Sequence, residues 1–517
     1  MGAQIWLVIA AIATACHFLS RYISPKYDAR EPQPLSPTIP LIGHVVGILR
    51  HGLQYYGKIR GVVRPAFSMN MLNTKIYVVS SASLVPMIQR ASKTISFDPF
   101  LSGAAERMAG IKKGDGLKLL QETESGGGGV NVAVVHAMKP SLLGSGLDKM
   151  NATMIKHLQR SIDELSASGG GPIDLHQWCR DAITVASSES VWGAKNPMRS
   201  KDLQEAFWEY DSNLTMLLFN TLPQIIARKP YKAREKIVQE FIKFYEAGGQ
   251  WEASELAFAR WKTQHDAGAT TENIARLESS LCVGVLSNTV PATFWTLFEI
   301  FSRPELLAKL RQEVWENAVH VSVDADGNTV NIVDLADIRN KCTLLIATFQ
   351  EVIRLRSNSA STRIVLDDIE INNQYLLKKG TMVHMPTLLI NREESTWGSD
   401  AAEFNPLRFI NGSNEKGSRL RPTGYLSWGS SPNMCPGRHF ATGEILSTVA
   451  MFMARYDITP TSGSWRPPAI NGSAIAASMS PPGEKFMVKF SVREGQDTAK
   501  WDFKVTEGQG KFKLVTG

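Results

Sequence analysis

Apolar side chains recur every three to four positions along much of this chain, with polar side chains between them. This spacing places the apolar positions on one face of an α-helix, and it predicts helices over residues 147–165, 201–218, 231–247, 272–302, 304–318, 341–356 and 438–454. Short apolar runs with turn residues between them, over residues 363–385, predict small strand hairpins. The sequence therefore predicts a mainly α fold with small β-sheets.

The start of the chain has a different pattern, because residues 3–19 are almost continuously apolar and are followed by Arg21 and Lys26. A membrane-spanning helix needs roughly 17–25 such residues, so a single transmembrane anchor is predicted over residues 1–20. The positive charges after it predict that the bulk of the protein faces the cytosol. A cleaved signal peptide is the alternative, since residues 13–15 (ATA) resemble a cleavage site, but no basic residue precedes the apolar run.

The predicted anchor is followed by prolines at positions 32, 34, 37 and 40, which favour an extended and semi-rigid chain. We interpret residues 21–45 as a Pro-rich hinge, with an ordinary loop as the alternative. The remaining residues, 46–517, contain no internal repeat and no low-complexity boundary. They are consistent with one large domain.

The net charge of +7 and the pI near 9.0 suit an acidic protein partner or an anionic membrane surface. Nucleic acid is not a predicted partner, because no dense Lys/Arg block with interleaved aromatic residues is present in the sequence. The 5 cysteines are widely scattered and form no C-x-x-C pair, which argues against a disulfide framework and against a zinc site. One of these thiols is therefore available for a role in catalysis or metal binding.

The helix predicted over residues 272–302 contains the sequence SNTVP, from Ser287 to Pro291. A proline inside a helix cannot donate its backbone hydrogen bond, and its ring displaces the carbonyl four residues earlier. The helix is predicted to bend beside Thr289 and to open a polar notch there. This notch could hold a small polar ligand or water, or it could be a packing kink with a threonine that satisfies its own hydrogen bond.

Two further segments carry candidate chemistry. Glu351 and Arg354 lie three residues apart on a predicted helix, where their charges can pair, although many exposed helix faces carry such pairs. Cys435 lies among small and turn-forming residues, and Pro436 then starts an apolar helix. A thiolate there would face a helix N-terminus, whose free N–H groups stabilise negative charge. We interpret Cys435 as an anionic metal ligand, with an inert core cysteine as the alternative.

In their order along the chain, these segments resemble the cytochrome P450 family over nearly the whole sequence. In that family a Cys-x-Gly loop supplies the axial thiolate of the haem iron, which corresponds here to Cys435 with Gly437. The helical Glu-x-x-Arg corresponds to Glu351 and Arg354, and its third partner, from an F-x-P-x-R-F segment, corresponds to Arg408. The sequence NTVPATFW in the central helix resembles the branch with cholesterol 7α-hydroxylase and prostacyclin synthase, and a fungal member of secondary metabolism would fit.

The sequence departs from the family pattern at several positions near the haem. The usual Trp-x-x-x-Arg of an early helix is missing, so the resemblance assigns the haem propionates to Arg363 together with His136 or Lys139. The tail after about residue 494 extends beyond the length expected for the family. Other departures are Trp428, Ser431 and Asn433 before the cysteine, and Asn288 before the helix threonine.

The resemblance implies an oxygen-dependent haem-thiolate monooxygenase. Thr289 would position oxygen and water near the iron, and Asn288 would order the surrounding hydrogen bonds. Because no flavin or nicotinamide motif appears in the sequence, the electrons would come from NADPH-cytochrome P450 reductase in the endoplasmic reticulum membrane. The alternatives are a haem-thiolate isomerase or dehydratase that acts on a peroxide without O2 or reductase, and a non-catalytic haem sensor or lipophile-binding protein.

The expected substrate is a lipophilic small molecule of terpenoid, steroid-like or other secondary-metabolite type. This expectation depends on the predicted pocket walls, which are mainly apolar and contain some small hydroxyl side chains. The alternative is that many of these residues belong to the ordinary hydrophobic core. The expected walls are residues 99–130, Phe207 to Leu217, Leu286, Asn358 to Thr362, and Ala474 to Pro481.

Overall fold

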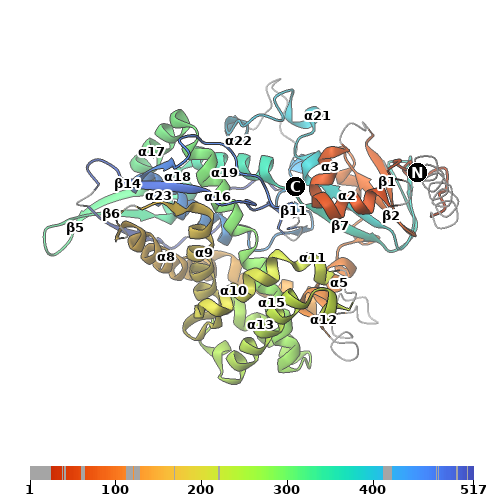
Figure 1. Cartoon of the computed structure of the whole chain (residues 1–517), viewed down its shortest axis with the longest axis horizontal. Helices are drawn as coiled ribbons and strands as arrows, with labels where there is room; N and C mark the ends of the chain where they lie inside the picture. Colours follow the sequence, from red (N-terminus) through yellow and green to blue (C-terminus); the bar gives the residue numbers. More distant parts are fainter. Residues whose placement is uncertain are drawn as a thin grey trace, which may run out of the picture.

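The structure is a computed structural model that describes residues 25–37, 39, 42–59, 64–111, 120, 129–167, 169, 171–218, 222–411, 422–472, 474, 477–496, 499–508 and 510–516. The anchor predicted over residues 1–20 lies outside the described residues. Helices make up most of the described chain, and the small sheets lie mostly toward the two ends of the long axis (Figure 1). The prediction of a mainly helical fold with small sheets is confirmed.

Each segment predicted to be helical corresponds to one helix or to two consecutive helices, with bounds that differ by a few residues. The sequence pattern does not predict α9, because buried polar residues such as Ser187 and Glu189 interrupt its apolar period. The longer helices are α2 (Gly43–His51), α4 (Val85–Arg90), α5 (Asp98–Ala109), α7 (Gly129–Met138), α8 (Gly144–Ala167), α9 (Leu175–Trp192), α10 (Lys201–Ser212), α13 (Arg228–Glu246), α14 (Glu255–Asp266), α15 (Thr271–Leu286), α16 (Thr289–Phe301), α17 (Pro304–Ala318), α18 (Leu335–Lys341), α19 (Thr343–Arg356) and α23 (Arg438–Arg455). The short helices are α3 (Tyr55–Lys58), α11 (Leu214–Leu218), α12 (Pro223–Ile226), α20 (Thr387–Ile390), α21 (Glu394–Trp397) and α22 (Leu407–Asn411).

The central helix predicted over residues 272–302 is present as α15 and α16, which are separated at Ser287 and Asn288. Pro291 has no N–H to bond to the carbonyl of Ser287, so the helix breaks one turn before the proline. The prediction of a bend beside Thr289 is therefore confirmed. Among the described helices, α15–α16 alone is long and apolar enough to cross a membrane, but most of it is buried inside the protein, as in a core helix.

The largest sheet has five strands in the order β1-β2-β10-β7-β3. The strand hairpins predicted over residues 363–385 are confirmed, because β7 and β10 pair antiparallel and β8 and β9 form a hairpin between them. These strands are β1 (Ala66–Met71), β2 (Thr74–Val79), β3 (Ile95–Ser96), β7 (Ala360–Val365), β8 (Ile369–Ile371), β9 (Tyr375–Leu377) and β10 (Met382–Pro386). The smaller sheets contain β4 (Ile173–Asp174) with β13 (Tyr456–Pro460) and β14 (Met487–Val492), β5 (Val319–Val323) with β6 (Thr329–Asp334) and β15 (Lys500–Lys504), and β11 (Gly429–Ser430) with β12 (Asn433–Met434).

Part of the predicted Pro-rich hinge is packed on the largest sheet. The N–H of Leu35 donates to the carbonyl of Ser68 (2.8 Å), and the N–H of Ser68 donates to the carbonyl of Gln33 (3.0 Å). Glu31 is buried and accepts a hydrogen bond from the hydroxyl of Tyr77 (2.5 Å). Residues 31–35 are therefore fixed to the sheet and do not form a free spacer.

The main hydrophobic core surrounds the central helix. Side chains from α9, α19 and α23 pack against those of α15 and α16, and α8 packs in turn against α9 and α23. This packing holds two chemically distinctive segments inside the molecule, namely the break in the central helix and the loop before α23. Both segments face the same interior cavity.

Candidate active site

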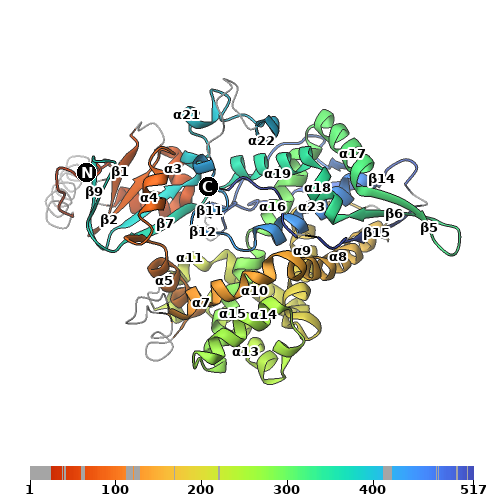
Figure 2. The same cartoon turned by 180° about the vertical axis from the view of Figure 1, so that it is seen from behind.

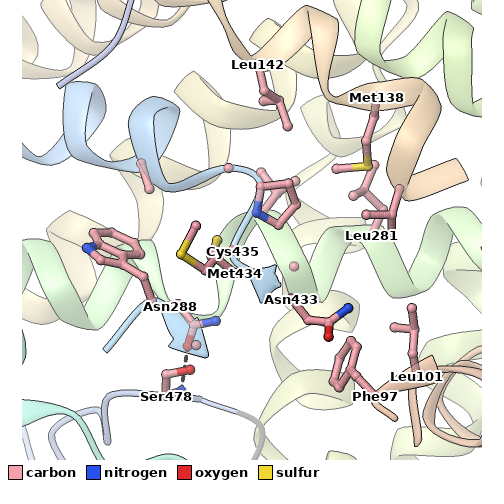
Figure 3. Close-up of a pocket in the computed structure, with 18 of the residues that line it drawn as sticks. Phe97, Leu101, Met138, Leu142, Leu281, Asn288, Asn433, Met434, Cys435 and Ser478 are labelled. Atoms are coloured by element: carbon pink, nitrogen blue, oxygen red, sulfur yellow. Dashed lines mark hydrogen bonds between the residues drawn. The ribbon is translucent and has the colours of Figure 1, made fainter. Parts of the chain in front are cut away.

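A cavity of about 610 Å³ lies between the central helix and the loop that precedes α23 (Figure 3). Its other walls come from α5, α7 and β7. Many of its lining side chains are apolar, such as Leu101, Val135 and Leu281. Pockets for small molecules and cofactors usually have volumes of about 300–1,000 Å³ and mostly apolar walls. The cavity therefore has the size and character of a binding site.

The side chain of Cys435 lines this cavity (Figure 3). The cysteine lies between β12 and α23, where its N–H donates to the carbonyl of Trp428 (2.7 Å) and its carbonyl accepts from the guanidinium of Arg438 (2.9 Å). Burial raises the pKa of the Cys435 thiol, while the N–H of Gly437 and the positive charge of Arg438 lower it. The predicted helix N-terminus is present, but a stable thiolate here also needs a cation in the cavity.

Cys435 differs from the other cysteines that the structure describes. Cys179, Cys282 and Cys342 are buried in the core, and none of them lines the cavity. Burial raises the pKa of each of these three thiols, so they remain protonated. Among the described cysteines, Cys435 alone can offer sulfur to a metal in the cavity.

Arg363 on β7 presents a buried positive charge at the cavity wall. Its side chain is 2% exposed and donates to the carbonyls of Ser430 (2.8 Å) and Thr362 (2.9 Å). Burial lowers the pKa of Arg363 to about 10 although the charge of Asp98 raises it, and no carboxylate in the described part of the chain lies close enough to form an ion pair with Arg363. A buried charge without an opposite charge is costly, so an anionic group on a bound molecule would stabilise this site.

The arrangement fits a haem group. At Gly437 an added Cβ would meet no atom within 4 Å, so open space reaches the backbone beside Cys435. His136 and Lys139, which are exposed at the end of α7, line the cavity together with Arg363. The sulfur can bind the iron, and the cations can bind the carboxylates of the propionates. The choice between His136 and Lys139 stays a prediction.

The charged residues predicted to act together meet in the structure. Arg354 donates to both carboxylate oxygens of Glu351 (2.6 and 2.8 Å), and Arg408 donates to one of them (3.1 Å). Arg354 also donates to the carbonyls of Asn391 (2.8 Å) and Ala401 (2.7 Å). The side chains of the three charged residues are at most 2% exposed. Such a buried network fixes α19 to the segment that leads toward the Cys435 loop.

The comparisons with known proteins agree with this geometry. A family model described as Cytochrome P450 matches residues 32–488. Cytochrome P450 monooxygenase nodJ of Hypoxylon pulicicidum is 44% identical over 496 residues, and the match covers 95% of each chain. The chain belongs to the cytochrome P450 family. It is an oxidoreductase of the P450 monooxygenase type with a haem-thiolate cofactor, as the sequence predicts.

More distant P450 relatives support the same fold and branch. Cholesterol 7-alpha-monooxygenase of Cricetulus griseus is 22% identical over 300 residues, which are 56% of this chain and 58% of that one. The solved structure "Retinoic acid bound cyanobacterial CYP120A1" has a TM-score of 0.69 at 15% identity, and the match covers 90% of this chain and 100% of that one. The resemblance to the cholesterol 7α-hydroxylase branch is confirmed, and the solved structure shows the P450 fold.

On the opposite wall of this P450 cavity lie Asn288 and Thr289, at the break between α15 and α16. Asn288 accepts a hydrogen bond from the N–H of Ser478 (2.6 Å) through its side-chain oxygen (Figure 3). The hydroxyl of Thr289 donates to the carbonyl of Val285 (3.1 Å), and its oxygen can still accept a hydrogen bond. The structure therefore combines both interpretations of the notch. Asn288 and Thr289 are polar groups that line the cavity, and the hydroxyl proton of Thr289 is hydrogen-bonded within its own helix.

The structure places the predicted pocket walls in part. Leu101, Ser359 to Thr362, Ser478 and Met479 line the cavity as expected. Phe207 to Leu217 do not line it in the described structure, because α10 packs against α13. Leu286 is also absent from the lining and is fully buried. Each step along a helix turns the side chain by about 100°, so Val285 lies over the cavity while Leu286 points away from it.

Sequence patterns miss a buried carboxyl group beside the helix break. The hydroxyl of Ser287 donates to the side chain of Asp211 on α10, and burial raises the pKa of Asp211 to about 6. No local pattern relates these residues, because they are 76 positions apart. Four polar atoms on cavity-lining residues are buried without a hydrogen-bond partner in the described structure, and these are Asn131 Nδ2, Gln264 Oε1, Ser280 Oγ and Trp428 Nε1.

Proposed function

We propose that this P450 uses Cys435 as its iron ligand and hydroxylates or otherwise oxidises a lipophilic small molecule with O2. The observation that carries the proposal is the presence, on one cavity, of the Cys435 sulfur and the buried charge of Arg363, which has no ion-pair partner among the described residues. The bound haem supplies the oxygen chemistry, which an axial thiolate favours. In the overall reaction, O2, two electrons and two protons convert a substrate C–H bond into C–OH and release the second oxygen atom as water.

The residues at the helix break are proposed to control protons and water. The oxygen of Thr289 accepts a hydrogen bond from water in the cavity, and Asn288, which is held by Ser478, keeps the break in place. Because the side chain of Asn288 does not ionise, it orients hydrogen bonds and does not itself supply a proton. Protons would therefore reach the cavity through water bound at Thr289.

The cavity wall supports a terpenoid, steroid-like or other lipophilic secondary metabolite as the substrate. Apolar side chains such as Phe97, Leu101 and Leu281 form one part of the wall (Figure 3). The unpartnered polar atoms of Asn131 and Ser280 lie among these apolar residues. Ligand pockets of this composition bind apolar molecules and orient them through a few polar groups. A lipophilic substrate with one or two oxygen functions would suit this wall.

The electrons are proposed to come from NADPH-cytochrome P450 reductase at the endoplasmic reticulum membrane. The sequence has no flavin or nicotinamide motif, so both electrons must enter from another protein. Residues 1–20 are proposed to anchor the chain, with the catalytic domain in the cytosol. Exposed apolar residues on and beside α12 support a membrane-facing surface, since Leu222, Ile225 and Ile226 are 62%, 73% and 56% exposed.

A second candidate is a haem-thiolate isomerase or dehydratase that acts on a peroxide. One observation favours this candidate. Asn288 occupies the position where an acidic residue would assist proton delivery, and its side-chain oxygen accepts a hydrogen bond from the N–H of Ser478. Such an enzyme would need neither O2 nor reductase. Product formation that depends on NADPH and reductase would support the monooxygenase and exclude this candidate.

The first test is the carbon monoxide difference spectrum of the reduced protein. The wild type is expected to give a strongly red-shifted Soret band, because a thiolate is bound to the iron, and Cys435→Ser is expected to lose it. Cys342→Ala is the matched control, since its buried thiol lies outside the cavity lining and its loss should leave the band in place. A red-shifted band that persists in Cys435→Ser would show that Cys435 is not the ligand.

A further inference from the structure

The C-terminal segment of the chain is an ordered part of the protein, although the family match ends at residue 488. Strand β15 pairs in parallel with β6, in a register that runs from Lys500 opposite Val330 to Lys504 opposite Asp334. Trp501 and Phe503 point into the core, and the residues between them face solvent. The segment therefore completes a sheet and is positioned by it.

Beyond β15 the chain is fixed across the start of α8. The N–H of Gly508 donates to the carboxylate of Asp148 (2.9 Å), which forms a buried ion pair with Arg339 (3.1 Å). Gly510 has a φ of +62°, and a Cβ there would meet the carbonyl oxygen of Gly144 at 2.7 Å. The close approach and the left-handed backbone both require glycine at this position. The path of the tail is thus defined by specific contacts.

The tail ends on the thiolate side of the haem site. The N–H of Phe512 donates to Nδ1 of His439 (3.2 Å), and the N–H of Val515 donates to the side-chain oxygen of Gln350 (2.6 Å). His439 lies one turn after Cys435, and Gln350 directly precedes the buried Glu351. In both views the C-terminal end lies beside β11, the strand that leads into the Cys435 loop (Figure 1, Figure 2). We define residues 510–516 as the terminal strap.

The terminal strap presents positive charge to solvent. Phe512 is buried against the core, while its neighbours Lys511 and Lys513 are exposed. Neither lysine has an ion-pair partner in the described part of the chain. Burial, Arg438 and Lys511 together lower the pKa of His439 to about 4, so Nδ1 is free to accept the bond from the strap at neutral pH. The strap thus places positive charge close to the segment that follows Cys435.

The loop that carries the proposed iron ligand is partly open to solvent. In the loop before α23, Pro432 is exposed and Asn433, Met434 and Pro436 are partly exposed. The opposite wall is the central helix, which is packed inside the core. Electron transfer between proteins becomes much slower as the distance between cofactors increases. An external electron donor on the loop side, beside the terminal strap, would therefore face the loop that carries the proposed iron ligand.

We propose that the terminal strap is part of the docking surface for the electron donor, and that Lys511 and Lys513 pair with carboxylates of an acidic flavoprotein reductase. This inference rests on the proposed function, in which two electrons enter from such a reductase. At each encounter the reduced flavin loses one electron and the ferric haem gains it, and no covalent bond forms or breaks. Opposite charges on the two surfaces accelerate the encounter and fix the orientation of the complex.

The experiment measures how fast NADPH-reduced cytochrome P450 reductase reduces the haem of the full chain, with carbon monoxide trapping the reduced form. Lys511→Glu/Lys513→Glu is expected to slow this step about ten-fold at low salt, and the difference should shrink as salt screens the charges. Lys511→Arg/Lys513→Arg keeps the charge and should keep the rate. Lys485→Glu/Lys489→Glu makes the same charge change in and beside β14, away from the strap, and should also leave the rate unchanged.

Reduction by dithionite separates this proposal from the proposed function. Every variant should give the same red-shifted band with dithionite, because the substituted lysines lie outside the cavity lining. If the reductase reduces the wild type and the Lys511→Glu/Lys513→Glu variant equally fast at low salt, the strap is not part of the docking surface. If the reductase does not reduce the wild type although dithionite does, the proposed electron source fails together with the docking surface.

Discussion

At the scale of single residues, Glu444 on α23 is a buried acid that the proposed chemistry does not use. It is fully buried, and both of its carboxyl oxygens accept from the hydroxyl of Ser187 on α9 (2.9 and 2.7 Å). Burial raises the pKa of Glu444 from 4.5 to about 8. In the folded protein Glu444 therefore keeps its proton up to about pH 8, whereas in the unfolded chain it loses this proton above about pH 4.5. The contribution of Glu444 to stability is fully present below about pH 4.5 and is lost as the pH rises toward 8.

The variant Glu444→Gln should remove this pH dependence, because the amide keeps the shape and never ionises. Its free energy of unfolding relative to the wild type should rise by about 1.4 kcal/mol per pH unit between pH 5 and 8, as judged from thermal or urea unfolding across that range. Glu316→Gln, which changes an exposed carboxylate, is the control and should follow the wild type. Parallel pH profiles for Glu444→Gln and the wild type would mean that Glu444 is already ionised in the folded protein.

At the scale of elements, α15 contains a glycine whose position points to substrate size. Gly284 faces the cavity, and a Cβ there would meet only the side chain of Leu281, at 4.0 Å. Glycine inside a helix costs about 1 kcal/mol relative to alanine. Its presence on the cavity side therefore leaves room for a bound molecule at the expense of helix stability.

The variant Gly284→Leu should fill part of the cavity without weakening the fold. Because leucine is a good helix former, the thermal midpoint should stay equal or rise, and the carbon monoxide spectrum should keep its red-shifted band. The small ligand imidazole should bind as before, while the bulky azole clotrimazole should bind about ten-fold more weakly in a spectral titration. Gly284→Ala should have a smaller effect. Unchanged clotrimazole binding by Gly284→Leu would place bulky ligands elsewhere in the cavity.

The elements also show which features a sequence pattern can predict. α17 and α19 appear in the sequence as periodic segments, and the hairpin strands appear as short apolar runs between turn residues. The Glu351–Arg354 pair could be predicted because both residues share one turn of helix. β15 could not, since its partner β6 lies more than 160 residues earlier and the pairing depends on the complete fold. The contact of Asp211 with Ser287 is hidden for the same reason.

At the scale of the whole molecule, two groups of exposed apolar side chains lie in the same half of the protein. Ile42, Val46 and Leu49 lie on one face of α2 and just before it, and Ile225 and Ile226 are exposed on α12. In Figure 1 both helices lie in the right-hand half of the molecule, with β1 and β2. Exposed apolar residues that gather on one side of a protein often mark a membrane contact. We expect this end of the catalytic domain to touch the membrane in addition to the predicted anchor.

A chain that lacks residues 1–24 should therefore still bind phosphatidylcholine vesicles that contain phosphatidylserine, because α2 and α12 remain. Ile225→Ser/Ile226→Ser in this shortened chain should weaken binding about a hundred-fold or more in a vesicle flotation assay, since each isoleucine loses apolar burial worth about 2 kcal/mol. Val321→Ser/Val323→Ser is the matched control, because these valines of β5 are 61% and 68% exposed at the other end of the molecule (Figure 1). An equal loss of vesicle binding in both variants would show that exposed apolar residues bind the vesicles non-specifically. Weaker vesicle binding by the α12 variant alone would show that this end of the domain lies against the membrane. The terminal strap and the Cys435 loop would then remain accessible to the electron donor.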